Sequence, residues 1–470
     1  MIAAVGNRAA ILLEEKSALP IENDEVIQSI VENQLQQLTL SLTSPESSKI
    51  LNCLSENTSL FNLDLHGFDD NNSTFEQKVE HIKNHLRKNN NFVNFFLHRC
   101  STNVINQLFK VFSSHIKYLS LEKCELGNSE KNQGWLALIK NMQNNLVYLN
   151  FSFNRFTCQD FCLLAEMLKD SSKLKTFIAS GNWPLFEDKC ITALANVLKV
   201  KTCALEVLKI GGVQCSALAG VTELAEALEA NKTLQSVSLI DNNFWLIPGF
   251  SKPFVRMVRA NLETLDLSSN WSSVARISEA ELLLEEWKDI NLKVLILDNA
   301  RISNALARVL AKGLKTNNSI VELGLANLHL ENAVISEILM ALANHPKLTN
   351  LNLSGSSLNG CGDAIALLIQ QSTSLTSLKI PACYIPDEDF ALIHAAVKSS
   401  WLLREFTFPL NYSRGLSDEI KSIVQRNFDY HIVVSRSLQD KCWFSMAQAD
   451  KTLLEKINLS LFNIFISKYP

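Results

Sequence analysis

His66 and His98 come closest in this sequence to a pair of residues that could do chemistry together. They occupy the same position in two repeated segments, so they could serve as metal ligands or as an acid–base pair. We place them two strands apart on an open sheet, which separates them by about 10 Å. One metal ion cannot span that distance, and the prediction is therefore two ordinary surface histidines and no metal site.

The eleven cysteines are odd in number and scattered without Cys-x-x-Cys pairs. This pattern predicts neither a disulfide framework nor a zinc site, and it indicates a reducing compartment. Cys158 and Cys162 are four residues apart on an expected helix, where two thiols facing the core are the interpretation we prefer to a pair of metal ligands.

No catalytic motif stands out elsewhere. The sequence has no Gly-x-x-x-x-Gly-Lys phosphate loop, no His-Glu-x-x-His, no Gly-x-Ser-x-Gly and no kinase set. We predict that the protein is not an enzyme and uses no cofactor. An enzyme with an unrecognised site in the irregular first 120 residues remains an alternative.

The composition is that of an ordinary globular protein. Of 470 residues, 47% are hydrophobic and 20% charged, and the net charge of −4 does not favour nucleic acid as a partner. No apolar run reaches the roughly 18 residues of a membrane span. The sequence predicts a cytoplasmic monomer without a membrane span.

The elements that position these residues follow a repeat, Leu-x-x-Leu-x-Leu-x-x-Asn. Fourteen segments begin with its first apolar residue, at intervals of 24 to 32 residues, and the last ten intervals cluster at 28 to 29. These first residues are Leu35, Leu60, Phe92, Ile116, Leu146, Leu174, Leu205, Leu234, Leu262, Leu292, Ile320, Leu348, Leu375 and Leu403.

Each unit has a physical interpretation. The alternating leucines put two apolar side chains on one face of a short strand, and successive strands stack in parallel. The ninth-position Asn can bond backbone groups where the chain leaves the strand. Cys100, Cys124 and Cys383 take that position in three units, which gives them a structural role. Helical apolar spacing follows each strand, as in Asn304–Leu314.

A unit of strand, loop, helix and loop with this length resembles the ribonuclease-inhibitor class of leucine-rich repeats, also found in the sensor regions of intracellular immune receptors. The resemblance covers Gln34 to Asn427. It implies an α/β solenoid, or horseshoe, with a parallel sheet on the concave face and helices on the convex face. It also implies that function depends on the variable exposed positions.

Three regions are expected. Residues 1–31 form an N-terminal helical cap, with helices over Ala9–Glu15 and Glu25–Leu35, and residues 32–427 hold about 14 repeats. Residues 428–470 form a C-terminal cap, with a strand at Tyr430–Val434 and a mostly helical Leu438–Ile466. The alternative for this last region is a secretion signal, because the composition resembles that of effectors of intracellular bacteria.

Positions three, five and seven of each unit should face the concave side. They carry six acids and two lysines, which disfavours nucleic acid. An aromatic patch and a mid-array patch stand out there, and two tryptophans follow the turn position on the rim. The predicted partner-binding residues are Phe96, Tyr118 and Tyr148 in the first patch, Val207, Ile240, Asp266, Ile296, Asp298 and Glu322 in the second, and Trp183 and Trp271 on the rim.

The sequence therefore predicts a non-enzymatic scaffold that binds an unidentified protein through its concave face. Its more specific form is a bacterial effector that leaves the cell by a non-classical route and binds a host protein in the host cytosol. A eukaryotic cytosolic leucine-rich-repeat regulator or inhibitor is the competing hypothesis.

Overall fold

The structure is a computed structural model of the whole chain. It describes residues 10–13, 23–44, 46–54, 57–67, 75–89, 93–111, 115–127, 134–182, 188–212, 215–244, 247–270, 290–300, 302–409 and 415–429. The chain divides into two compact units, Met1–Ser272 (unit 1) and Ser273–Pro470 (unit 2). Each unit is described by itself.

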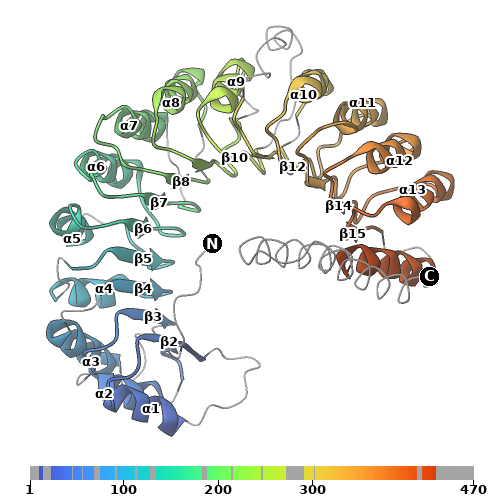
Figure 1. Cartoon of the computed structure of the whole chain (residues 1–470). Coiled ribbons are helices and arrows are strands. Elements are labelled where there is room, and N and C mark those ends of the chain that lie inside the picture. Colours follow the sequence, from blue (N-terminus) through green and yellow to red (C-terminus); the bar gives the residue numbers. More distant parts are fainter. Residues whose placement is uncertain are drawn as a thin grey trace, which may run out of the picture. The chain divides into compact units, whose positions relative to one another are not determined.

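Unit 1 alternates strands with helices, and its strands form a parallel sheet in the order of the sequence. Figure 1 shows its helices on the outer side of the strands. The elements are β1 (Ala10–Leu13), α1 (Asn23–Val31), β2 (Gln37–Ser41), α2 (Ser47–Leu54), β3 (Asn62–His66), α3 (Phe75–Lys88), β4 (Asn94–His98), α4 (Thr102–Phe109), β5 (Tyr118–Glu122), α5 (Gly134–Met142), β6 (Tyr148–Asn150), α6 (Cys158–Leu168), β7 (Thr176–Ile178), α7 (Asp188–Leu198), β8 (Val207–Lys209), α8 (Leu218–Ala230), β9 (Ser236–Ser238), α9 (Ser251–Arg259) and β10 (Thr264–Asp266).

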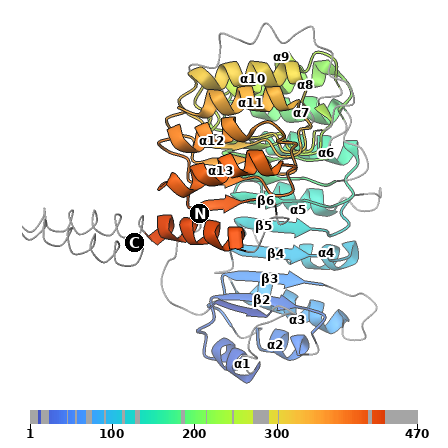
Figure 2. The same ribbon diagram turned by 90° about the vertical axis from the view of Figure 1, so that its right-hand side faces the viewer.

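Unit 2 repeats the same arrangement, and Figure 2 gives a second view of its helices. A helix over 415–429 follows its last described strand. The elements before it are β11 (Val294–Ile296), α10 (Asn304–Thr316), β12 (Glu322–Gly324), α11 (Asn332–Leu342), β13 (Asn350–Asn352), α12 (Gly362–Gln371), β14 (Ser377–Lys379), α13 (Asp387–Ser399) and β15 (Glu405–Thr407).

The predicted register is confirmed in every repeat, including the irregular first three. Each of the strands β2 to β15 begins two residues after the predicted first residue of its unit. In β3, Leu63 and Leu65 are fully buried while their neighbours are half-buried, as the period of two requires. The predicted fold class, an α/β leucine-rich-repeat solenoid, is likewise confirmed. We call the surface formed by the strand side chains that point away from the helices the strand face.

Buried asparagines tie neighbouring repeats together, as the ninth position of the motif predicts. The Asn154 amide donates to the carbonyls of Leu121 (2.7 Å) and Phe151 (2.9 Å), and its Oδ1 accepts from the N–H of Cys124 (2.9 Å). Asn182 then accepts from the N–H of Asn154 at 3.0 Å. The turns of these three consecutive repeats are therefore joined by hydrogen bonds that satisfy their buried backbone groups.

The cysteines at the ninth position use their thiols in the same way. Cys124 Sγ lies 3.3 Å from the carbonyl oxygen of Leu97, and Cys383 Sγ lies 3.2 Å from that of Leu353. Both are buried. A thiol is a weak donor that still reaches the carbonyl of the preceding repeat, which supports the structural role predicted for these cysteines.

A second set of polar residues, which the sequence analysis missed, lies three residues before the first apolar residue of several described repeats. Asn231 donates to the carbonyl of Leu198 and accepts from the N–H of Leu234. Asn427 closes helix 415–429 in the same way, with an amide bond to the carbonyl of Leu403 at 2.8 Å. The sequence pattern that could have predicted these residues is an Asn, Ser or His that recurs three residues before the first apolar residue of a repeat.

Position eight of most described repeats adopts a left-handed backbone. Arg99, Lys123 and Phe153 all have φ of 56°, and Gly181 occupies the equivalent position at 70°. Asn and Gly tolerate this conformation best. The three large side chains are therefore held in an uncommon backbone conformation where the strand ends, beside the strand face.

The prediction for the N-terminus was partly wrong. Ala10–Leu13 forms strand β1, paired in parallel with β2, where Ala9–Glu15 was expected to be helical. Its run of Ala, Ile and Leu suits a helix or a buried strand equally, and the open edge of β2 decides in favour of the strand. The second expected helix is present as α1. The predictions for Tyr430–Val434, Leu438–Ile466 and the secretion signal lie outside the described residues.

A search of the described residues for a helix that could cross a membrane finds none that is long and apolar enough.

Replacing Asn154 by Ala should lower the free energy of unfolding by about 1–3 kcal/mol, because the buried backbone groups that it bonds lose their partner. Urea titration followed by circular dichroism measures the change. Asn144→Ala is the matched control, since Asn144 is an exposed asparagine of the preceding repeat, and it should shift stability by no more than about 0.5 kcal/mol. Equal effects of the two substitutions would contradict this role of Asn154.

Candidate functional site

Three aromatic side chains predicted to form a patch do meet on the strand face of unit 1. Tyr118 and Tyr148 are register partners on β5 and β6, and their rings stack with centroids 6.3 Å apart. Phe96 on β4 meets the Tyr148 ring edge-on at 6.4 Å. Tyr118 is 38% exposed, and the other two are half-buried. We call these three residues the aromatic cluster.

A cationic side chain lies just after the end of β5, the strand that begins with Tyr118. The ammonium of Lys123 lies 4.8 Å from the centroid of the Phe153 ring and 3.6 Å from a carboxylate oxygen of Glu122. Phe153 is 52% exposed. A Cβ at Gly181 would come within 2.5 Å of the Phe153 ring, so glycine at this position leaves room for it. Phe153 thus offers exposed apolar area at this place, and Lys123 offers a positive charge.

The tyrosine at the centre of the aromatic cluster is held in its neutral form. Burial raises the pKa of Tyr148, and the negative charge of Glu122 raises it further. Asn150, two residues along β6, donates to the hydroxyl of Ser120 at 3.1 Å and so links β6 to β5. The phenol therefore stays a hydrogen-bond donor throughout the neutral pH range.

The predicted separation of His66 and His98 is wrong. They lie on the adjacent strands β3 and β4 as register partners, and their rings stack with centroids 4.6 Å apart and planes 9° apart. The expectation failed because it placed another strand between two consecutive repeats. Asp64 Oδ1 lies 3.1 Å from His66 Nε2 and 3.4 Å from His98 Nε2. We call Asp64, His66 and His98 the histidine cluster.

Burial disfavours the charged forms of Asp64 and His98 in the histidine cluster. It raises the pKa of Asp64, against the opposing attraction of the two imidazoles. It lowers the pKa of His98, although Asp64 and Glu122 favour the charged imidazole. Asp64 was recognised from the sequence as a concave acid but not as a partner of the histidines. The sequence did contain a pattern that could have predicted this contact. Asp64 is at position five of one repeat, and histidines occupy position seven of that repeat and of the next.

The residues of the second predicted patch belong to both units. In unit 1, Val207 on β8 is half-buried, and Ile240, just after β9, is 37% exposed. Asp266 on β10 accepts from the backbone N–H of Ser268 at 3.0 Å, and the Ser238 hydroxyl lies 3.4 Å from it. The carboxylate is thus bonded within the protein.

In unit 2, Ile296 and Glu322 are half-buried on β11 and β12. Asp298 accepts from the N–H of Ala326 at 2.8 Å and from the amide of Asn352 at 3.0 Å, which reaches over the strand between them. Gly324 allows this, because a Cβ there would lie 2.7 Å from the carboxylate. Hydrogen bonds within the protein therefore occupy part of the acceptor capacity of the acids predicted for the strand face.

The two predicted rim residues, Trp183 and Trp271, lie outside the described residues. One aromatic residue of the same rim is described in unit 2. Tyr384 is 68% exposed, and its backbone makes an isolated bridge to Ser357.

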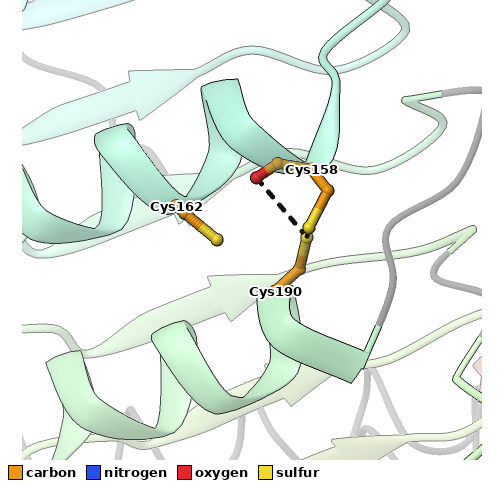
Figure 3. Close-up of side chains that lie close together, drawn as sticks. All are labelled: Cys158, Cys162 and Cys190. Atoms are coloured by element: carbon orange, nitrogen blue, oxygen red, sulfur yellow. Dashed lines mark hydrogen bonds between the residues drawn. The ribbon is translucent and has the colours of Figure 1, made fainter.

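A second group of possible metal ligands lies between two helices. Figure 3 shows Cys158 and Cys162 on α6 facing Cys190 on α7. The sulfurs of Cys158 and Cys190 are 2.8 Å apart, and all three sulfurs lie within 4.8 Å of one another. The prediction that Cys158 and Cys162 face the core is wrong: both are only half-buried and turn toward the neighbouring repeat. Burial raises the pKa of Cys162.

These repeats define the chain as a leucine-rich-repeat protein. It is 26% identical over 254 residues to the human protein "NACHT, LRR and PYD domains-containing protein 13", an alignment that covers 53% of this chain and 20% of the relative. The chain thus matches about a fifth of that protein's length. No protein-family model matches the sequence.

Two solved structures are similar at lower levels. A structure titled "Leiomodin-1 Actin-Binding Site 2 (ABS2)" has 21% identity and a TM-score of 0.31, and the match covers 36% of this chain and 99% of that one. A TLR13–ssRNA13 complex has 15% identity and a TM-score of 0.43, with 80% and 53% covered. The fold assignment therefore depends on the described strands and helices themselves.

The cysteine geometry predicts which disulfide a mild oxidant forms. Diamide takes up the two thiol hydrogens, and a bond between Cys158 and Cys190 should result because their sulfurs are in contact. Peptide mapping by mass spectrometry detects the linked peptides. Cys190→Ser should abolish this link and Cys162→Ser should leave it in place. A product without the Cys158–Cys190 link would contradict the arrangement in Figure 3.

Proposed function

We propose that this protein is a non-enzymatic scaffold that binds another protein on the strand face of unit 1. The aromatic cluster of Phe96, Tyr118 and Tyr148 carries the proposal. Tyrosine dominates binding surfaces because a rigid ring buries a large apolar area while its hydroxyl keeps a polar contact. Two tyrosines and a phenylalanine on an open sheet, with the Tyr148 ring in contact with both of the others, have the composition of a binding hot spot.

The strand geometry supports this use of the aromatic cluster. The rings project from three consecutive strands, whose backbone is fixed by parallel pairing. A partner therefore meets side chains that lose little conformational freedom on binding. Acids on the same face, such as Glu122 beside Tyr148, favour a partner segment that carries basic residues. The same acids disfavour nucleic acid.

Exchanging Tyr118 and Tyr148 together for Ala should weaken partner binding about 10- to 100-fold, as expected when two hot-spot residues are lost. Affinity capture from a lysate with quantitative mass spectrometry identifies the partner, and titration calorimetry then gives the affinity. Phe428→Ala is the matched control, because it removes an exposed aromatic side chain from helix 415–429 of unit 2. The Trp183→Ala/Trp271→Ala pair tests the rim separately.

Two results would count against this proposal. If both double variants retain every partner, the strand face and the rim are not the binding surface. If the captured ligand is nucleic acid that nuclease treatment removes, the partner class is wrong.

The more specific proposal is that the scaffold acts as a bacterial effector inside a host cell. Its support is compositional: Asn, Ser and Lys are abundant, and the 470 residues include only 15 glycines. A cytosolic regulator or inhibitor is the alternative, supported by the similarity to the human NACHT protein.

A translocation reporter fused to the chain separates these two proposals. An effector with a C-terminal signal should enter host cells as the full chain and fail to do so without residues 451–470. Equal export of both forms would overturn the signal, and export of neither would favour the regulator.

A further inference from the structure

We propose that Asp64, His66 and His98 form a binding site for a divalent transition-metal ion of the zinc class. One atom from each residue, Oδ1 of Asp64 and a ring nitrogen of each histidine, lies within 4.8 Å of the other two. Two imidazole nitrogens and a carboxylate oxygen are ligands that zinc accepts in proteins. The inference does not depend on the proposed function, because metal binding can be measured without a partner.

The two distances from Asp64 in the histidine cluster are those expected between ligands of one ion. Zinc bonds to nitrogen and oxygen are about 2.0–2.2 Å long, so two tetrahedral ligands lie about 3.4 Å apart. Asp64 Oδ1 lies 3.1 Å from one Nε2 and 3.4 Å from the other. This oxygen is buried, and neither contact has the alignment of a hydrogen bond. Its lone pairs therefore remain available to an ion.

The strands hold these ligands in place. Register pairing sets His66 directly opposite His98, and Asp64 lies two residues earlier on the same face of β3. The rings are nearly parallel, so a modest tilt of each ring points both nitrogens at one ion. Because the backbone positions are fixed by the sheet, binding requires only this side-chain adjustment.

A second carboxylate stands behind one of the histidines. Glu122 Oε2 lies 3.7 Å from Nδ1 of His98, on the side away from Asp64. Histidines that bind metals usually direct their other nitrogen to such an acceptor, which fixes the ring and raises its basicity. At 3.7 Å this contact is too long for a hydrogen bond, and a small rotation of the Glu122 side chain toward Nδ1 would let it orient His98 as a ligand.

The site is open on the strand face. The His66 side chain is 43% exposed, and those of Asp64 and His98 are 27% and 22% exposed. Three protein ligands leave one position of a tetrahedral ion for water or for a group from a bound molecule. Glu122 faces His98, and its charge also acts on Tyr148 of the aromatic cluster, so an occupied site would belong to the surface proposed to bind the partner.

Cobalt and zinc titrations of the full chain test this proposal. The Cys158→Ser/Cys162→Ser/Cys190→Ser variant is used as the background, so that the thiols of α6 and α7 do not contribute. We expect one equivalent of Co²⁺ to bind with visible d–d absorption and no sulfur charge-transfer band. Zn²⁺ should displace it and raise the melting temperature, because a ligand that binds only the folded state stabilises it.

Four substitutions define the ligands. His66→Ala, His98→Gln and Asp64→Asn should each weaken zinc binding at least tenfold, and Glu122→Gln about tenfold or more, as expected for a residue that orients a ligand. His115→Ala, an exposed histidine of the same unit, should have no effect. Circular dichroism checks the folding of each variant. If His98→Gln does not fold, the result for His66→Ala tests the proposal, because His66 is more exposed and its substitution disturbs the fold less.

Absence of saturable binding would overturn the proposal, as would binding that His66→Ala leaves unchanged. A failed capture experiment with the aromatic variants would not affect it.

Discussion

Each repeat must return the chain to a parallel strand about 4.8 Å from the previous one, and the rest of the structure depends on this constraint. It places residues of the same repeat position directly opposite each other. Tyr118 therefore stacks on Tyr148, His66 stacks on His98, and Asn154 bonds to Asn182. Groups 28 to 32 residues apart in the sequence become neighbours without any further folding device. The side-chain contacts named here thus join residues of the same type at the same position of neighbouring repeats.

The same constraint creates a demand for buried hydrogen bonds. Every unit turns twice, once after the strand and once before the next, and both turns bury backbone groups away from water. Asparagine satisfies buried backbone groups at both kinds of turn, because its amide can donate and accept hydrogen bonds at the same time. The thiols of Cys124 and Cys383 replace only the hydrogen bonds that the asparagine amide donates. The interior is therefore held by buried polar residues as well as by leucine, and the strand face is free to carry other residue types.

On the strand face of unit 1, Glu122 connects two groups that the sequence treats separately. It faces His98 on one side, pairs with Lys123, and its charge acts on Tyr148. The histidine cluster and the aromatic cluster are therefore parts of one surface on consecutive strands. A molecule bound there would meet a polar, ion-binding end and an apolar, aromatic end, which is a more specific surface than either cluster alone.

The sequence by itself determined the repeat, its register and the aromatic cluster, because a period of two within strands and a constant unit length leave few other arrangements. Tertiary structure decided the rest. It made Ala10–Leu13 a strand, because only the open edge of β2 distinguishes a strand from a helix in so short an apolar run. It brought Asp64 to the two histidines, and it turned Cys158 and Cys162 toward Cys190. These contacts join side chains of different repeats, and their geometry depends on which strands and helices are immediate neighbours.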